Sequence, residues 1–100
     1  MQFFAHLGIR TQSVSRETLT AELVALEIQA IKDLLASAKV HQAWKRPDCH
    51  CVVLLVNAFS EQECRGLLTG LPFAKAGILD IQLIAPVELY VEAYPDPLQD

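Results

Sequence analysis

The stretch HCVVLLVNA, residues 50–58, decides the fold, because it reads as a strand with no polar side. Its β-branched and aliphatic residues are apolar at both parities, and successive side chains of a strand point to opposite faces of a sheet. Both faces of the sheet must therefore be covered. Helices can cover one face, and the other face needs a partner. We therefore expect a homo-oligomer.

Three further segments predict strands around this one. Residues 2–9 (QFFAHLGI) are rich in strand formers, and residues 40–46 (VHQAWKR) and 78–87 (ILDIQLIAPV) have the same character. Pro47 and Asp48 predict a turn between the second strand and the third, since proline presets φ and aspartate readily takes turn conformations.

Two helices are predicted between the strands. An apolar stripe of helical spacing runs from about Arg16 to Ser37, with Ser15 as its expected N-cap. The sequence SEQE at residues 60–63 is a capping box, in which Ser60 caps a second helix and Glu63 reaches back to it. This short helix should end near Gly70, which can adopt the left-handed conformation of a C′ residue.

The resulting order, β-α-β-β-α-β, predicts a ferredoxin-like α+β domain over residues 1–100, with an antiparallel sheet that carries both helices on one face. The apolar opposite face would be exposed unless a second subunit packs against it, sheet to sheet. A small cavity between sheet and helices is then a natural ligand site. The tail, about residues 88–100, is expected either to dock on a neighbouring subunit or to fray.

Composition excludes several classes of function. The net charge is −4, and the 8 Lys and Arg residues are scattered, so no nucleic-acid partner is expected. The longest strongly apolar run, Val52–Val56, is far too short to span a bilayer, and the first residues lack the features of a signal peptide. Three cysteines without a framework spacing fit a reducing compartment, so we expect a cytoplasmic protein without a membrane partner.

Glu27 occupies an unexpected position on the first helix. At about 100° per residue, the apolar residues of LVALEIQAIKDLL (23–35) form one arc, Gln29, Lys32 and Asp33 lie opposite, and Glu27 falls in the middle of the apolar arc. Burial disfavours the ionised form of a carboxyl, so its pKa rises toward the pH at which it can take and return a proton. Alternatively, Glu27 snorkels to a pocket rim or pairs with a buried partner such as His6 or His50.

Several segments resemble the muconolactone delta-isomerase family. They are LLTGLPF (67–73), the preceding SEQE, the Trp44-Lys45 strand and the opening strand, and the similarity extends from about Ser37 to Phe73. The strongest piece is LLTGLP, where the family typically has LLSGLP. The resemblance implies a cofactor-independent enzyme that forms dimeric α+β barrels, often assembled into decamers. Its reaction moves a proton within a small unsaturated lactone during the breakdown of aromatic compounds.

The resemblance also implies roles for residues. The family carries a glutamate on the inner face of its first helix, and Glu27 occupies the matching position. The third strand departs from the family pattern, because His50 and Val52 stand where the family has a tyrosine and an asparagine. His50 could donate a hydrogen bond to a developing enolate oxygen. Val52 cannot, so the substrate is expected to be less polar than muconolactone.

Three other residues are candidates for substrate contact. His6 shares strand parity with Phe4 and Gly8 and could face the cavity, or it could be a core histidine bonded to backbone. Trp44 and Phe73 could line the pocket, although aromatics in so small a fold usually belong to the core.

The motif CHC at 49–51 invites a metal-site interpretation. Alternation places Cys49 and Cys51 on one face and His50 on the other, and no second cysteine pair completes a tetrahedral set, so no metal is expected.

Three functional hypotheses remain. The first is a cofactor-free isomerase or related lyase, with Glu27 as base, His50 as electrophilic helper and a small-molecule substrate. The second is a binding or accessory protein that keeps the cavity without the chemistry, and the third is a structural oligomer. An enzyme should enclose Glu27 and His50 in one cavity, whereas a structural role would pair Glu27 with a cation and leave no cavity.

Overall fold

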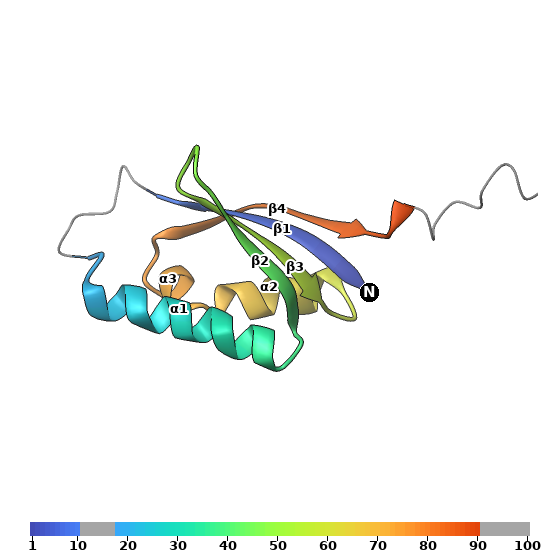
Figure 1. Ribbon diagram of the computed structural model, residues 1–100, viewed down its shortest axis with the longest axis horizontal. Helices are drawn as coiled ribbons and strands as arrows, with labels where there is room; N and C mark the ends of the chain where they lie inside the picture. Colours follow the sequence, from blue (N-terminus) through green and yellow to red (C-terminus); the bar gives the residue numbers. More distant parts are fainter. Residues whose placement is uncertain (11–17, 91–100) are drawn as a thin grey trace, which may run out of the picture.

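The computed structural model describes residues 1–10 and 18–90 and contains one sheet covered on one side by helices (Figure 1). The strand order is β2-β3-β1-β4, and every neighbouring pair is antiparallel, which confirms the ferredoxin-like α+β fold. In chain order the elements are β1 (Gln2–Ile9), α1 (Ala21–Ala36), β2 (Val40–Arg46), β3 (Cys51–Asn57), α2 (Glu61–Thr69), α3 (Pro72–Lys75) and β4 (Leu79–Val87).

The first helix begins later than expected. Residues 18–20 are not helical, and α1 starts at Ala21, so the predicted start at Arg16 is wrong. The expected N-cap, Ser15, lies outside the described residues. Thr20 is the N-cap instead, since its hydroxyl accepts a hydrogen bond from the Leu23 amide at 3.1 Å.

The end of α2 also differs from the prediction. Ser60 and Glu63 form the expected cap, but Gly70 has φ −80° and ψ −9°, a right-handed conformation. The chain does not need to reverse there, because it continues into α3, a short helix not expected from the sequence that starts at Pro72. Left-handed residues follow α1 and α3 instead, at Ala38 (φ 60°) and Gly77 (φ 76°).

The core lies between the sheet and the helices. Phe3, Ala5 and Leu7 of β1 point toward the helices, and Leu54 of β3, opposite Ala5, lies on the same side and is 0% exposed. The helices pack unequally on this floor. Cys64 and Leu68 of α2 are fully buried, whereas α1 has no buried residue and contributes only half-buried side chains. This looser packing of α1 leaves room for a cavity.

The opposite face of the sheet carries no helix (Figure 1). We call it the open face, and its apolar members include Phe4, Val53, Leu55, Trp44 and Leu83. Trp44 is 48% and Leu83 49% exposed. Among the described residues, no helix has the length and apolarity that a membrane span requires. The expected C-terminal tail lies outside the described residues from position 91 onward.

Candidate active site

A cavity of about 370 Å³ opens between α1 and the sheet. This is within the size range of small-molecule sites. Most of its wall is aliphatic, and four side chains bring charge or polarity to it: Glu27, Lys32, Lys45 and His50. The remaining lining residues are Leu7, Ile9, Val24, Ile28, Ile31, Ala43, Trp44, Cys51, Val52, Phe73 and Leu79.

Glu27 projects from the middle of the inner surface of α1 into this cavity. Its Oε1 accepts a hydrogen bond from the backbone amide of Phe73 at 3.1 Å, near the start of α3. The carboxyl is half-buried, and this burial raises its pKa above the ordinary value, while the Phe73 hydrogen bond acts in the opposite direction. Its other oxygen, Oε2, makes no hydrogen bond within the part of the chain that the structure describes.

Glu27 also has no ion-pair partner among residues 1–10 and 18–90. The pairing with His6 or His50 considered from the sequence is therefore not seen there. A half-buried carboxyl held by one backbone donor, without a neutralising cation, is suited to gaining and losing a proton.

His50 also lines this cavity, from the turn that joins β2 to β3. It lies in the turn before β3, and its carbonyl accepts a hydrogen bond from the Ile9 amide at 2.9 Å, which ties this backbone to β1. The imidazole makes no hydrogen bond to any other described residue, so it is available to a ligand. Val52, two residues further, forms part of the apolar floor opposite Leu7.

Two lysines of the cavity wall were missed from the sequence. Lys45 pairs with Val52 across the β2–β3 ladder and so shares the inner face, and Lys32 comes from the outer edge of α1. Strand alternation could have identified Lys45, because it shares a face with Ala43, and Ala43 lies opposite the core residue Leu54.

The two aromatic candidates both border the cavity. Phe73 lines the cavity and, at 8% exposed, is also part of the hydrophobic core. Trp44 contributes from the edge strand, but it pairs with Val53, so strand alternation assigns its side chain to the open face.

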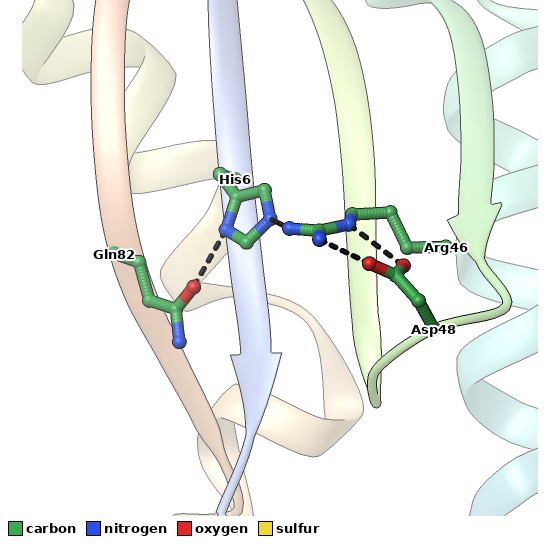
Figure 2. A network of polar contacts seen from close by, with 4 residues as sticks. All are labelled: His6, Arg46, Asp48 and Gln82. Atoms are coloured by element: carbon green, nitrogen blue, oxygen red, sulfur yellow. Dashed lines mark hydrogen bonds and ion pairs between the residues drawn. The ribbon is translucent and has the colours of Figure 1, made fainter.

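His6 is the one candidate that does not line this cavity. It pairs with Val53 on one side and Leu83 on the other, and it therefore lies on the open face. Figure 2 shows its ring between Gln82 and Arg46, at 2.6 Å from Gln82 Oε1 and 3.1 Å from Arg46 Nη1. The parity that faces the helices, Phe3, Ala5 and Leu7, is wholly apolar, whereas the parity of His6 also carries Gln2 and Gly8, so the pattern of β1 already favours the open face for His6.

The cysteines do not assemble a metal site among the described residues, where no group of three or more His, Cys, Asp or Glu side chains converges. Interaction with the Cys51 thiol raises the pKa of the Cys49 thiol, which keeps it in its neutral form. Burial raises the pKa of the Cys64 thiol in the same direction.

No protein-family model and no curated protein sequence matches this chain. Among solved structures, the chain is similar to 5-chloro-2-hydroxyhydroquinone dehydrochlorinase from Burkholderia phenoliruptrix, in a complex with 2,5-dihydroxybenzoquinone. The TM-score is 0.68 at 18% sequence identity, and the match covers 88% of this chain and 94% of that one. At this identity the similarity shows the shared fold.

Proposed function

We propose that this protein is a cofactor-independent isomerase that shifts a proton within a small unsaturated lactone or related cyclic carbonyl compound. The observation that carries the proposal is the placement of Glu27. It is a half-buried carboxyl with a raised pKa, it has no cationic partner in the described chain, and it shares one cavity with an unengaged imidazole.

The geometry supports a division of labour between the two groups. The Glu27 carboxylate removes a proton from the carbon at one end of the conjugated system, α or γ to the ring carbonyl, and the electron pair of the broken C–H bond is delocalised into the carbonyl as an enolate. His50 donates a hydrogen bond to the enolate oxygen and so stabilises the developing charge. Glu27 then returns the same proton to the far carbon of the conjugated system, and the carbonyl re-forms.

The hydrogen bond from Phe73 holds Glu27 during this cycle. It engages Oε1 in both protonation states, which leaves Oε2 to carry the proton. Because the donor is a backbone amide, the carboxyl is oriented without a full neutralising charge that would lower its basicity.

The ligand of the similar structure agrees with the size of the cavity. That protein is described with 2,5-dihydroxybenzoquinone, a single ring that bears carbonyl and hydroxyl oxygens. A cavity of about 370 Å³ accommodates one such ring. A substrate from the breakdown of aromatic compounds fits this proposal.

Proton exchange in deuterated buffer tests the proposal. Muconolactone and a panel of less polar butenolides are followed by NMR with wild type, Glu27→Gln and the control Glu22→Gln, which changes an exposed glutamate of the same helix. We expect deuterium incorporation or isomerisation with wild type and the control, and a loss of about 100-fold or more with Glu27→Gln. Equal exchange by all three proteins would remove Glu27 from the reaction.

The same panel includes 5-chloro-2-hydroxyhydroquinone, the compound named for the similar protein. Release of chloride that depends on Glu27, without exchange into any lactone, would reassign the protein as a lyase.

A second candidate function is binding without turnover. Val52 favours it, because an aliphatic floor opposite Leu7 offers no hydrogen bond to an oxygen-rich ligand. This candidate predicts that lactones or quinones bind wild type and Glu27→Gln equally, as measured by calorimetry, and that no proton exchanges.

We also propose that the protein acts as a homodimer in the cytoplasm, formed through the open face, with further assembly possible as in the family it resembles. Exposed Trp44 and Leu83 support an apolar contact there, and free cysteines fit a reducing compartment. Sedimentation velocity of wild type and Leu83→Glu tests this, since a charge within the apolar contact should yield monomers.

A further inference from the structure

A chain of polar side chains crosses the open face from one edge strand to the other (Figure 2). Gln82 of β4 contacts His6 of β1, His6 contacts Arg46 at the end of β2, and Arg46 contacts Asp48 in the following turn. We call these four residues the sheet network. It links three strands and the β2–β3 turn, and it passes over β3 without engaging it.

The donors and acceptors of the sheet network determine the state of His6. Arg46 is always charged and can only donate, so Nε2 of His6 must be an acceptor in the 3.1 Å contact. Nδ1 then carries the proton and donates to Gln82 Oε1 at 2.6 Å. His6 is thus a neutral imidazole in the Nδ1–H tautomer, and no other state satisfies both contacts.

Arg46 connects this histidine to the turn. Its Nε lies 3.1 Å from Asp48 Oδ1 and its Nη2 lies 2.6 Å from Oδ2, a paired geometry that closes residues 46–48 into one unit. The remaining nitrogen, Nη1, reaches His6. Each of the three guanidinium nitrogens therefore makes one contact, and a lysine could not reproduce this set.

The turn held in this way carries His50. Two residues after Asp48, the chain crosses to the helix side, where His50 borders the cavity and its carbonyl is bonded to the Ile9 amide. The turn is thus tied to β1 at two points, by Arg46 to His6 on the open face and by His50 to Ile9 in the backbone.

Gly8 leaves the space that the Gln82 side chain occupies beside β1. A Cβ at this position would collide with the amide group of Gln82, so the absence of a side chain allows Gln82 to lie flat beside β1 and meet His6.

We propose that His6, Arg46 and Asp48 are positioning residues for His50, acting from the opposite face of the sheet. The inference rests on the proposed function for the role of His50. A neutral His6 accepts a hydrogen bond from Arg46 and fixes its guanidinium, and Arg46 fixes the turn through its ion pair with Asp48. The turn then holds the imidazole of His50 at the substrate. His6 therefore serves the cavity without facing it.

The test compares wild type with Arg46→Lys, and uses Arg65→Lys as a matched control, since Arg65 is an exposed arginine whose described ion pair, with Glu61, is on α2. Nitrogen-15 NMR of the histidine rings should find His6 as the Nδ1–H tautomer in wild type and in the control. In Arg46→Lys, His6 should revert to Nε2–H, and exchange of the Ile9 amide should accelerate about tenfold.

Asp48→Asn separates the two halves of the sheet network. It removes the charged pairing within the turn but leaves the contact between Arg46 and His6. We expect the His6 tautomer to be retained and the Ile9 amide to exchange faster than in wild type. With a substrate of the lactone panel, Arg46→Lys and Asp48→Asn should each lower kcat while KM stays within twofold. This is expected because His50 stabilises the enolate rather than the bound substrate.

An Nε2–H tautomer of His6 in wild type, or an unchanged Ile9 exchange rate in Arg46→Lys, would overturn the proposal. These readouts do not depend on turnover. If no lactone reacts with wild type, the proposed function fails while the NMR results still decide whether the sheet network holds the turn.

Discussion

The two faces of the sheet treat their charged groups differently. On the open face, Arg10 pairs with Asp80 and Arg46 pairs with Asp48, so each charge meets its opposite on the same surface. On the helix side, Glu27 has one backbone donor and no ion-pair contact among the described residues. These open-face charges are compensated within the sheet, whereas Glu27 faces the cavity without an ion pair in the described part of the chain.

The difference has an energetic reason. An exposed ion pair contributes little to stability, and its two charges cost little free energy because water still hydrates them. A half-buried carboxyl without a cation is less stable when ionised, and this cost is tolerated where the proton is used. The helix side would be more stable without Glu27, whereas the open face would gain nothing from losing its pairs.

The largest expected effect concerns two adjacent leucines of β3. Leu54 faces the helices and is 0% exposed, while Leu55 is half-buried on the open face. Leu54→Ala should lower the free energy of unfolding by about 2–5 kcal/mol. Leu55→Ala should lower it by about 1 kcal/mol at low protein concentration.

Urea unfolding at two protein concentrations measures both effects. If a second copy covers the open face, the cost of Leu55→Ala should grow with concentration, while the cost of Leu54→Ala relative to wild type should stay constant. A concentration-independent difference for Leu55→Ala would argue against the proposed dimer.

The floor of the cavity provides the next prediction. Val52→Asn introduces an amide where the wall is aliphatic, and the new donor should pair with an oxygen of the ring. We expect KM, or Kd in the absence of turnover, to fall about tenfold for muconolactone and to change little for less polar butenolides. Val53→Asn places the same amide on the open face and should leave both constants unchanged.

The pH dependence of stability should reveal the cost of Glu27. Its pKa is raised in the folded protein, so between the unfolded and folded pKa values the folded state binds more protons. The free energy of unfolding should therefore fall as pH rises through this interval and be constant above it. Glu27→Gln removes that decline and keeps an acceptor for the Phe73 amide.

At neutral pH we expect Glu27→Gln to be more stable than wild type by about 0.5 kcal/mol, a small value because the carboxyl is still partly in contact with water. The difference should vanish at acidic pH. Thermal unfolding over a pH series measures it, with Glu22→Gln as the exposed control. A less stable variant at neutral pH would mean that Glu27 is a structural cap of α3.

The smallest effect is expected on the open face. Asp80→Asn breaks the ion pair with Arg10. The side chains of Arg10 and Asp80 are 51% and 45% exposed. The loss of stability should be the smallest of the series at low salt and smaller still at high salt, because the pair is screened by solvent and ions. A loss as large as that of Leu54→Ala would show that this charge is buried by another subunit.

Local patterns were sufficient for several features. The alternation of apolar residues, the capping box at Ser60 and the turn at Pro47 predicted the order of strands and long helices, because each depends on residues close in the chain. The start of α1 was misassigned, since serine and threonine are both good N-cap residues by type, and the Leu23 amide donates to Thr20. Gly70 is right-handed because the chain continues into α3. That helix has only 4 residues, too few to give a recognisable periodic pattern in the sequence.

The sequence by itself determined that a carboxylate would lie at the centre of the apolar arc of α1, because helical geometry places Glu27 there whatever α1 packs against. The tertiary structure alone decided what surrounds it. Phe73, which is 46 positions away, supplies its hydrogen bond, and His50 joins it across the cavity. His6 lies on the opposite face with the mixed parity of β1, and only the tertiary structure brought Gln82 and Arg46 to its ring, because these partners come from β4 and β2.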